Sequence, residues 1–409
     1  MSSATYRTLL RTPGAGAFFL TAAVGRVGIA MTGLGIVWLV HARTGSYATA
    51  GLVTGGFAIA EAAAGPQLAR LIDRFGQARV LPPALLAHAA AVATLLALVA
   101  GGAPDWLMTA GGALAGATIP QLGALSAARW AALLDGGQTA ALPTAFALEA
   151  LANEAAFLVG PALVSILGAT GRPALGTTLA GALVVAGGLC FAAQRRTAPA
   201  VATVAVAATV TATVPDAAAD RRAGRSLLRP GFAVLVGVNL AIGVFFGAMQ
   251  ISVTAFAVEH GVAGAAAALF TVSSCASLLA GWLYGLRRWR TSAPVQLAVA
   301  AAGLAAGCLP LLVARSPVEL ACGLALTGLT IPALLVLCSV LAESAVHRAV
   351  LTQAFVWLNS ATAAGSAGAT AVAGWAVGAF GARGGFTVAA TAAAVLAAMA
   401  VTGVRALRR

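Results

Sequence analysis

Long apolar stretches separated by short polar segments fill almost the whole chain. A helix needs about 20 apolar residues to cross the hydrocarbon core of a bilayer. Charged residues, prolines and turn residues divide the chain into twelve such stretches, and we predict that each is a membrane-spanning helix. The predicted helices cover residues 16–40, 47–69, 80–101, 106–128, 141–168, 173–193, 230–258, 262–286, 293–314, 318–341, 349–379 and 384–404.

The least hydrophobic internal stretch, residues 194–229, separates six predicted helices from six. The two sets resemble each other: LARLIDRFGQARV follows the second helix, and AGWLYGLRRWR ends the eighth, at the equivalent turn. Paired six-helix halves around a central site are a common transporter plan. The pattern therefore predicts an all-α membrane protein with two six-helix pseudo-repeats, an N-terminal bundle (1–193), a cytoplasmic linker (194–229) and a C-terminal bundle (230–409).

Composition and charge agree with a membrane location. The chain is 60% hydrophobic and 9% charged, with a mean hydropathy of +0.95, whereas soluble domains carry about 25% charged residues. All 24 cationic residues are arginines, and with both termini inside, 19 of them fall in inside segments and four outside. This bias predicts cytoplasmic termini in the cell inner (plasma) membrane. It also accounts for the net charge of +13 without a nucleic-acid partner.

The sequence lacks the motifs that would predict an enzyme. It contains no HExxH, no Gly-x-Ser-x-Gly and no nucleotide-binding loop, which are the patterns of common hydrolytic and nucleotide-dependent sites. The five cysteines fall within apolar spans without the close spacing of a metal site. We therefore expect a monomer in the lipid bilayer with no catalytic activity, no cofactor and no metal.

Four charged residues, Arg26, Glu61, Glu149 and Glu154, fall inside the predicted spans. A charge near the bilayer centre costs roughly 2.5–3.5 kcal/mol on insertion scales, and chains that keep one usually use it. Arg26, Glu61 and Glu154 lie near the middle of their helices, and Glu149 lies about 7.5 Å nearer the inside end than Glu154. Because five helical positions rotate by about 140°, the two glutamates of this helix cannot share a face.

These charges suggest proton coupling. Burial raises the pKa of a carboxyl and a nearby arginine lowers it, so a balanced group can bind and release a proton. Our hypothesis is that Glu154, or else Glu61, carries the proton and that Arg26 tunes its affinity, with Glu149 in the inside vestibule or beside Arg129. The alternative is a static Arg26–Glu pair that holds helices together.

The segment Ala69–Arg79, between the second and third helices, resembles the cytoplasmic loop signature of the major facilitator superfamily, G-x-x-x-D-R-x-G-R-R. Asp73, Arg74 and Gly76 match it and Arg79 supplies a late cation, while the leading glycine and the basic pair are replaced. The resemblance implies a gate that latches the outward-open state. A positive-inside hairpin with a solvated aspartate is the alternative.

Gly160-Pro161, in the fifth helix, resembles the core of the helix 5 signature of proton-coupled drug antiporters in this superfamily. Proline bends a helix and glycine permits close approach of a neighbour, so a packing kink is the alternative. The arginine that those antiporters carry within the fourth helix is missing, since Arg129 lies at its inside end. Arg26 could supply the displaced cation.

The resemblance also implies that the first, fourth, seventh and tenth helices line the substrate cavity. On the seventh helix, Asn239, Phe246 and Gln250 are spaced seven and four apart and form one stripe. The residues expected to line a mainly apolar cavity are Arg26, Thr32, Trp38, Gln121, Asn239, Phe246, Gln250 and Thr330.

Taken together, these features favour a proton-coupled exporter of a small, largely apolar organic compound, such as a drug or secondary metabolite, that works by alternating access. One alternative is uptake or facilitated transport of a polar or anionic solute, with Arg26 as the substrate anchor. Another is a membrane enzyme or structural scaffold.

Overall fold

The computed structural model describes residues 6–135, 138–199, 226–262, 265–287 and 289–407. All regular structure within these ranges is helical, so the predicted all-α class is confirmed. The described helices are α1 (Tyr6–Leu10), α2 (Ala15–Thr44), α3 (Tyr47–Phe75), α4 (Gln77–Ala100), α5 (Asp105–Thr118), α6 (Leu122–Leu133), α7 (Leu142–Ala169), α8 (Pro173–Ala193), α10 (Pro230–Glu259), α11 (Ala266–Leu286), α12 (Ala293–Val313), α13 (Pro317–Ala345), α14 (Leu351–Phe380) and α15 (Ala382–Leu407), with short 3-10 turns η1 (Thr139–Ala141), η2 (Arg195–Thr197), η3 (Ser226–Leu228) and η5 (Arg348–Val350).

Ten of these helical segments are long and apolar enough to cross a membrane. The other two predicted spans are α3, which carries Glu61 and three further charged residues, and the α5–α6 pair. Together they make the twelve spans expected for a multi-pass membrane protein.

The fourth span differs from the expected single helix over 106–128. It breaks between α5 and α6 because Pro120 has no backbone N–H to continue the helical ladder. Ile119, directly before the proline, is extended (φ −71°, ψ 123°), as residues before proline tend to be. The break places Gln121 at the N-cap of α6, beside Glu61 of α3.

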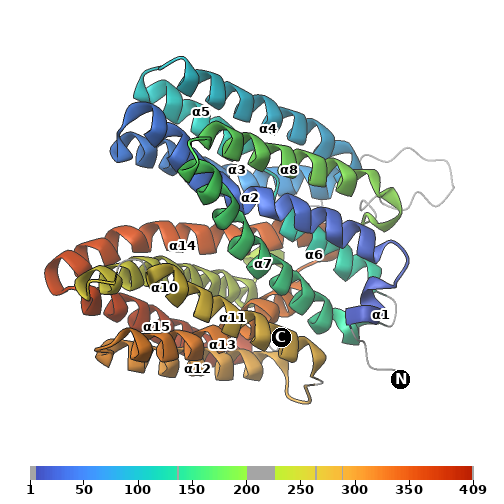
Figure 1. Cartoon of the computed structure of the whole chain (residues 1–409). Coiled ribbons are helices and arrows are strands. Elements are labelled where there is room, and N and C mark those ends of the chain that lie inside the picture. The colour runs from blue at the N-terminus through green and yellow to red at the C-terminus, as the bar shows by residue number, and fades with distance from the viewer. Residues whose placement is uncertain (1–5, 136–137, 200–225, 263–264, 288, 408–409) are drawn as a thin grey trace.

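The helices pack as two groups (Figure 1). In the first, α2 packs on α7 and α8, α3 on α5, and α4 on α5 and α8; in the second, α10 packs on α14 and α15, α13 on α11 and α12, and α12 on α15. We refer to α1–α8 as the first half and α10–α15 as the second half. Of the predicted linker between them, residues 200–225 lie outside the described part of the chain.

Small residues allow close helix packing within each half. A Cβ atom on Gly243 or Gly247 of α10 would lie 1.9 Å and 2.3 Å from the carbonyl oxygens of Thr362 and Ser366 on α14. Only glycine permits this approach, which is a common way for helices to associate where the surrounding lipid is as apolar as the side chains. The two helices therefore pack closely along this contact.

The two halves meet along two pairs of antiparallel helices, α3 with α14 and α7 with α11, and α7 and α6 also touch α13 and α14. We refer to the α3–α14 and α7–α11 contacts as the two seams. The ribbons of the two halves converge near α1, α6 and the end of α11, and diverge toward the opposite end (Figure 1). We refer to the first of these ends as the linker end and to the second as the far end.

Candidate functional site

Arg26 and Glu149 form a buried ion pair inside the first half. One Arg26 guanidinium nitrogen (Nη2) binds Glu149 Oε2, and the other (Nη1) donates to the Glu149 carbonyl oxygen at 3.1 Å. Arg26 is 4% exposed and Glu149 8%. The sequence predicted that Arg26 pairs with Glu154 or Glu61. This pairing is wrong for this conformation, because the Arg26 guanidinium binds Glu149 on the neighbouring α7.

Two side chains of α6 complete the surroundings of this pair. Ser126 Oγ and Trp130 Nε1 donate to Glu149 Oε1 at 2.6 Å and 2.7 Å. Both carboxylate oxygens of Glu149 are thus hydrogen-bonded, and α2, α6 and α7 are joined at one point. Glu149 lies neither in an inside vestibule nor against Arg129, contrary to expectation. The contact agrees with the alternative of an Arg26–Glu pair that holds helices together. That the pair is static stays a prediction.

Arg129, at the linker end of α6, is held in a similar way by neutral groups. Its guanidinium donates to Gln77 Oε1 (2.8 Å), to the carbonyls of Gln194 (3.1 Å) and Phe191 (3.0 Å), and to Thr197 Oγ1 (3.1 Å). It also lies 3.7 Å from the centre of the Phe191 ring. These contacts fasten α6 to α4 and to the end of α8.

Glu154 lies on the α7–α11 seam, 12 residues after the start of α7 and 15 before its end. The seam begins at the linker end, where Thr144 Oγ1 donates to the Gly285 carbonyl at 2.9 Å, and continues where Leu151 packs on Gly281. One turn further, the Glu154 carboxyl lies within reach of the Ser277 hydroxyl of α11. Ser277 is 3% exposed and has no regular hydrogen-bond partner among the described residues.

Glu61 holds the corresponding place on the α3–α14 seam, fourteen residues from either end of α3. The linker end of this seam carries Asp73, and Gly65 then packs on Val356 and Ser360 of α14. One turn beyond Gly65, Glu61 Oε1 accepts a 2.6 Å hydrogen bond from Gln121 Nε2 at the helix break. Glu61 and Glu154 are both partly exposed, and both have only neutral partners.

The gate residues predicted from the loop signature lie at the linker end. Asp73 Oδ2 accepts a 2.9 Å hydrogen bond from the backbone N–H of Gln353, in the first turn of α14, where free N–H groups favour an anion. Burial raises the pKa of Asp73 to about 6, against the opposing effect of hydrogen bonds from Thr352 and Gln353. Gly76 makes the tight α3–α4 turn with φ at 88°. Arg74 and Arg79 are exposed.

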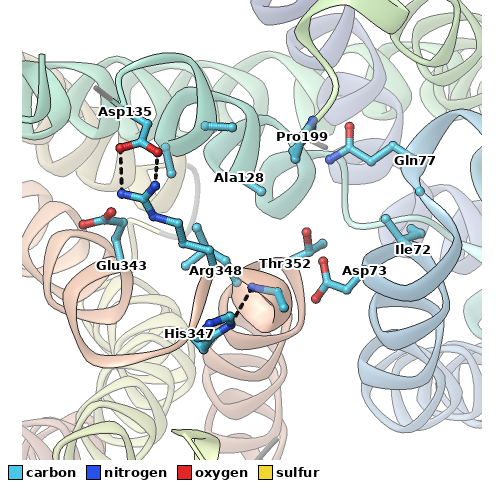
Figure 2. Close-up of a pocket in the computed structure, with 15 residues that line it drawn as sticks. Ile72, Asp73, Gln77, Ala128, Asp135, Pro199, Glu343, His347, Arg348 and Thr352 are labelled. Atoms are coloured by element: carbon cyan, nitrogen blue, oxygen red, sulfur yellow. Dashed lines mark hydrogen bonds and ion pairs between the residues drawn. The ribbon is translucent and has the colours of Figure 1, made fainter. Parts of the chain in front are cut away.

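A second cross-half contact flanks this gate. Arg348 of η5 forms a bidentate ion pair with Asp135, which follows α6. Its Nη2 donates to Asp135 Oδ1 at 2.7 Å. A cavity of about 370 Å³ lies between the Asp135–Arg348 pair and Asp73. Figure 2 shows Glu343 and His347 on its second-half wall.

The N-terminal helix also crosses between the halves. Tyr6 Oη lies 3.1 Å and 3.0 Å from the carbonyl oxygens of Gly281 and Trp282 at the linker end of α11. A Cβ on Gly285 would meet the Tyr6 hydroxyl, so the tyrosine occupies a notch that glycine leaves open. Four hydrogen-bonded or ionic contacts between the halves, involving Tyr6, Asp73, Asp135 and Thr144, thus gather at one end of the bundle.

The residues expected to line a substrate cavity do not gather in one place. Asn239 is buried, its amide donates to Leu235 O (2.9 Å), and its carbonyl oxygens accept from Thr362 of α14. Thr32 is buried and bonds to Gly28 O in its own helix. Neither faces a cavity in this conformation, because helix packing surrounds both.

The remaining cavity candidates divide between packing positions and open ones. Trp38 packs on Gly168 of α7, and Thr330 packs on Gly303 of α12. Phe246 is half-buried and Gln250 is exposed on α10. Gln121 borders a small space between α3, α6 and α14 and binds Glu61.

Gly160 and Pro161 occupy the contact between α7 and α2. A Cβ on Gly160 would lie 3.0 Å from the Val27 carbonyl and the Ala30 side chain. This close approach supports the packing interpretation of the Gly-Pro pair. A gating role for the two residues stays a prediction.

Sequence reasoning missed the partners that decide the role of each charge. Ser126 and Trp130 lie four apart on one face of α6, and that spacing could have marked them as a polar pair. Nothing in the local sequence marks Ser277, Tyr6 or the Asp135–Arg348 pair, whose members come together only when the halves meet.

Comparisons with known proteins identify the fold. No protein-family model matches the chain, and no curated protein matches its sequence. Solved structures do match over nearly the whole chain. The human organic anion transporter MFSD10 (TETRAN) is 16% identical, with a TM-score of 0.70 over 94% of this chain and 98% of its own.

Two further structures agree. A bacterial homologue of the iron transporter ferroportin, in the outward-facing state with soaked iron, is 12% identical with a TM-score of 0.71 over 95% of this chain and 98% of its own. The Major Facilitator Superfamily transporter FucP, in the outward conformation, is 16% identical with a TM-score of 0.66 over 96% and 99%. The chain therefore has the twelve-helix fold of the major facilitator superfamily transporters.

Proposed function

We propose that this protein is a secondary active transporter that exports a small, largely apolar organic compound in exchange for protons, by alternating access. The observation that carries the proposal is the position of Glu61 and Glu154. Each lies in the middle of a seam between the halves, one turn beyond the last tight contact. A carboxyl placed where two rocking halves separate changes its surroundings as access alternates, which is the requirement for a coupled proton.

In this proposal, the linker-end contacts hold the two halves together in an outward-open state. Asp73 with Gln353, Asp135 with Arg348, Thr144 with Gly285 and Tyr6 with α11 all join the halves at the same end. The solved ferroportin homologue and FucP of the same fold are in outward conformations, which supports this assignment. If the termini are cytoplasmic, as the arginine distribution predicts, the closed end faces the cytoplasm.

We assign different roles to the two kinds of interior charge. Glu61 and Glu154 are the proposed proton carriers, because each is partly exposed and has a single type of neutral partner. Arg26 and Glu149 are proposed to hold α2, α6 and α7 together throughout the cycle. The Arg26–Glu154 switch expected from the sequence would require Arg26 to leave the Glu149 carboxylate that it binds.

Uptake of a polar or anionic solute with Arg26 as anchor is the alternative, and MFSD10 is described as an organic anion transporter. For Arg26 to bind such a solute, Glu149 would have to give way to it. An anchor role predicts that Arg26→Gln abolishes substrate binding while the protein stays folded. A structural role predicts loss of folded protein instead.

Transport in liposomes tests the proposal. The purified protein is reconstituted with a pH-sensitive dye inside, a pH gradient is imposed, and fluorescent hydrophobic compounds are screened for movement against their own gradient. We expect export that stops when a protonophore collapses the pH gradient. The variant Glu319→Gln, which alters an exposed carboxyl at the start of α13, is the matched control and should transport normally. Flux that ignores the gradient would identify a uniporter.

A further inference from the structure

The turn between α11 and α12 stands where the first half has its gate segment, but its chemistry is different. Each turn follows a glycine that packs across a seam, Gly65 in α3 and Gly281 in α11. Eight residues after this glycine, the first half has Asp73 and the second half has Trp289, and an arginine follows in both. Because a tryptophan replaces the carboxylate, the α11–α12 turn cannot bind the first turn of a helix in the other half as the gate segment does.

Trp289 folds back on the end of α11 and positions an arginine. Its ring centre lies 4.9 Å from that of Tyr284, and its Nε1 donates to the Tyr284 carbonyl at 3.3 Å. Tyr284 Oη in turn donates to Gln296 Oε1 of α12 at 2.8 Å. The Arg287 guanidinium lies over the Trp289 ring, 4.6 Å from its centre. The aromatic pair is thus fixed to both helices, and it holds the guanidinium by a cation–π contact without an acid.

The positive charge of this turn is not neutralised within the described part of the chain. Residues 260–318, which include α11, α12 and the turn, contain no aspartate or glutamate. Arg287 and Arg290 are exposed, and neither takes part in an ion pair between described residues. The linker-end acids of neighbouring elements, Asp135 and Glu343, line the cavity between the halves instead. The outer surface at this end of α11 is therefore cationic.

An apolar wall adjoins this cationic surface. Trp282, Leu283 and Leu286 are exposed at the linker end of α11, which is long and apolar enough to cross the membrane. Trp282 and Leu286 are four apart and so share one face of the helix. Tryptophan beside arginine at the end of a span is typical of the headgroup level of a bilayer. The surface thus offers charge for a phosphate and, directly next to it, hydrocarbon for acyl chains.

We infer that the α11–α12 turn binds the headgroup of an anionic phospholipid. Arg287 and Arg290 contact the phosphate, since a guanidinium can donate two parallel hydrogen bonds to phosphate oxygens. The acyl chains lie along the apolar wall of α11. A headgroup with a net negative charge is preferred, because a zwitterionic headgroup brings its own cation to a surface that has no acid to receive it. The inference concerns the membrane partner of the chain and is independent of the transported compound.

The test compares two lipids that share their acyl chains and differ in headgroup charge. Palmitoyl-oleoyl phosphatidylglycerol is anionic, and palmitoyl-oleoyl phosphatidylcholine is zwitterionic. Each is titrated against the purified full-length protein in a neutral detergent, and native mass spectrometry measures the bound lipid. Glycerophosphoglycerol, the anionic headgroup without acyl chains, is added as a competitor in a parallel titration. We expect the tightest site to bind phosphatidylglycerol about tenfold more strongly than phosphatidylcholine.

Substitutions locate the site. The double variant Arg287→Gln/Arg290→Gln should weaken phosphatidylglycerol binding by about tenfold or more, because each arginine near a membrane surface contributes about fivefold. Trp289→Leu keeps both charges but removes the ring beside Arg287, so a smaller loss of about two- to fivefold is expected. The matched control is Arg195→Gln/Arg196→Gln, which removes two exposed arginines of η2 and should leave the lipid preference unchanged. Unchanged melting temperatures show that the variants are folded.

Three results would overturn the inference. The first is equal binding of the two lipids by the wild-type protein. The second is a preference for phosphatidylglycerol that survives in the folded Arg287→Gln/Arg290→Gln variant, or that is lost to the same extent in the Arg195→Gln/Arg196→Gln control. The third is displacement of phosphatidylglycerol by glycerophosphoglycerol at similar concentrations, which would identify a site for soluble phosphate esters in place of a lipid site.

Discussion

The Arg26–Glu149 pair and the two seam carboxylates, Glu61 and Glu154, place similar chemical groups in different surroundings. The first pair lies inside one half, with its carboxylate bonded to a guanidinium, a serine and a tryptophan. Glu61 and Glu154 lie between the halves, and each has a neutral neighbour, Gln121 beside Glu61 and Ser277 beside Glu154. All four residues lie within apolar helices, with Glu149 nearer the linker end of α7 than Glu154.

The role of a charged residue within a span therefore depends on the groups to which it is bonded. The two charges of a buried ion pair neutralise each other, and removal of one member leaves an unpaired charge in a low-dielectric interior. The surroundings of a carboxyl on a seam change whenever the two halves of a transporter move apart. The two sets should therefore respond differently to mutation.

The largest expected effect comes from breaking the Arg26–Glu149 pair. Arg26→Ala leaves a buried, unpaired carboxylate, which typically costs about 3–5 kcal/mol. We expect a large drop in the melting temperature in detergent and in the yield of folded protein. The double variant Arg26→Leu/Glu149→Leu should recover part of this loss, because no charge is then left unpaired.

The exposed residue Arg383 provides the control for this experiment, since Arg383→Ala removes a cation outside the described ion pairs. A stable Arg26→Ala protein that has lost only its proton coupling would contradict the structural role and restore Arg26 as part of the coupling mechanism.

Neutralising the seam carboxyls should affect function far more than stability. Glu61→Gln and Glu154→Gln keep the size of the side chain, and loss of a single hydrogen bond to a neutral group costs about 1 kcal/mol. We expect melting temperatures close to wild type, together with at least a roughly tenfold loss of pH-driven transport, since positioned proton-transfer groups contribute about 10²-fold or more to rates. If both variants keep coupled transport, neither residue carries the proton.

A pH dependence is expected from Asp73 at the linker end. Burial raises its pKa to about 6 in the closed structure, above the ordinary value of about 3.9. Because the raised pKa means that the closed form binds the proton more tightly, closure should be favoured as the pH falls from about 6 toward 4. At neutral pH, the ionised carboxylate should favour opening.

Spin labels at Arg79 and Arg290, both exposed at the linker end, can measure this effect in a variant without native cysteines. The short-distance population should grow between pH 7 and pH 5. Asp73→Asn can still accept the Gln353 hydrogen bond but cannot titrate, and it should remove the pH dependence. An unchanged dependence in this variant would assign the titration to another group, such as Glu343 in the adjoining cavity.

The smallest effect is expected at Tyr6. Tyr6→Phe removes the hydroxyl that bonds to Gly281 and Trp282 but keeps the ring, so about 0.5–1.5 kcal/mol of linker-end closure is lost. The same spin-label pair should report a modest shift toward the open distance. Gly285→Ala should give a larger shift, since its Cβ would collide with the tyrosine hydroxyl. A wild-type distance distribution in both variants would show that the N-terminal helix does not help to close this end.

Much of the fold could be predicted from local pattern. Apolar length predicts the spans because the bilayer sets a minimum helix length, and all twelve predicted spans correspond to described helices. The break at Pro120 was missed because proline is tolerated in membrane helices when neighbours satisfy the freed backbone groups. His88 Nδ1, for example, lies 3.2 Å from the Ala115 carbonyl on the α5 side of the break.

The candidate site was predictable in its members but not in its pairings. The sequence singled out Arg26, Glu61, Glu149 and Glu154, since charge in an apolar run is visible without a structure. It could not choose the partner of Arg26. Glu149 and Glu154 differ by about 140° around α7. Helix α7 packs on α2 on one side and on α11 on the other. Only this packing decides that Glu149 faces its own half and that Glu154 faces the seam.

The sequence by itself therefore determined that this chain is a bundle of apolar helices with a few costly charges, because hydropathy and helix length are local properties. The tertiary structure alone decided which charges are neutralised and which remain available. Countercharges come from helices more than a hundred residues away, as Arg26 and Glu149 show, and a one-dimensional pattern holds no record of which faces meet.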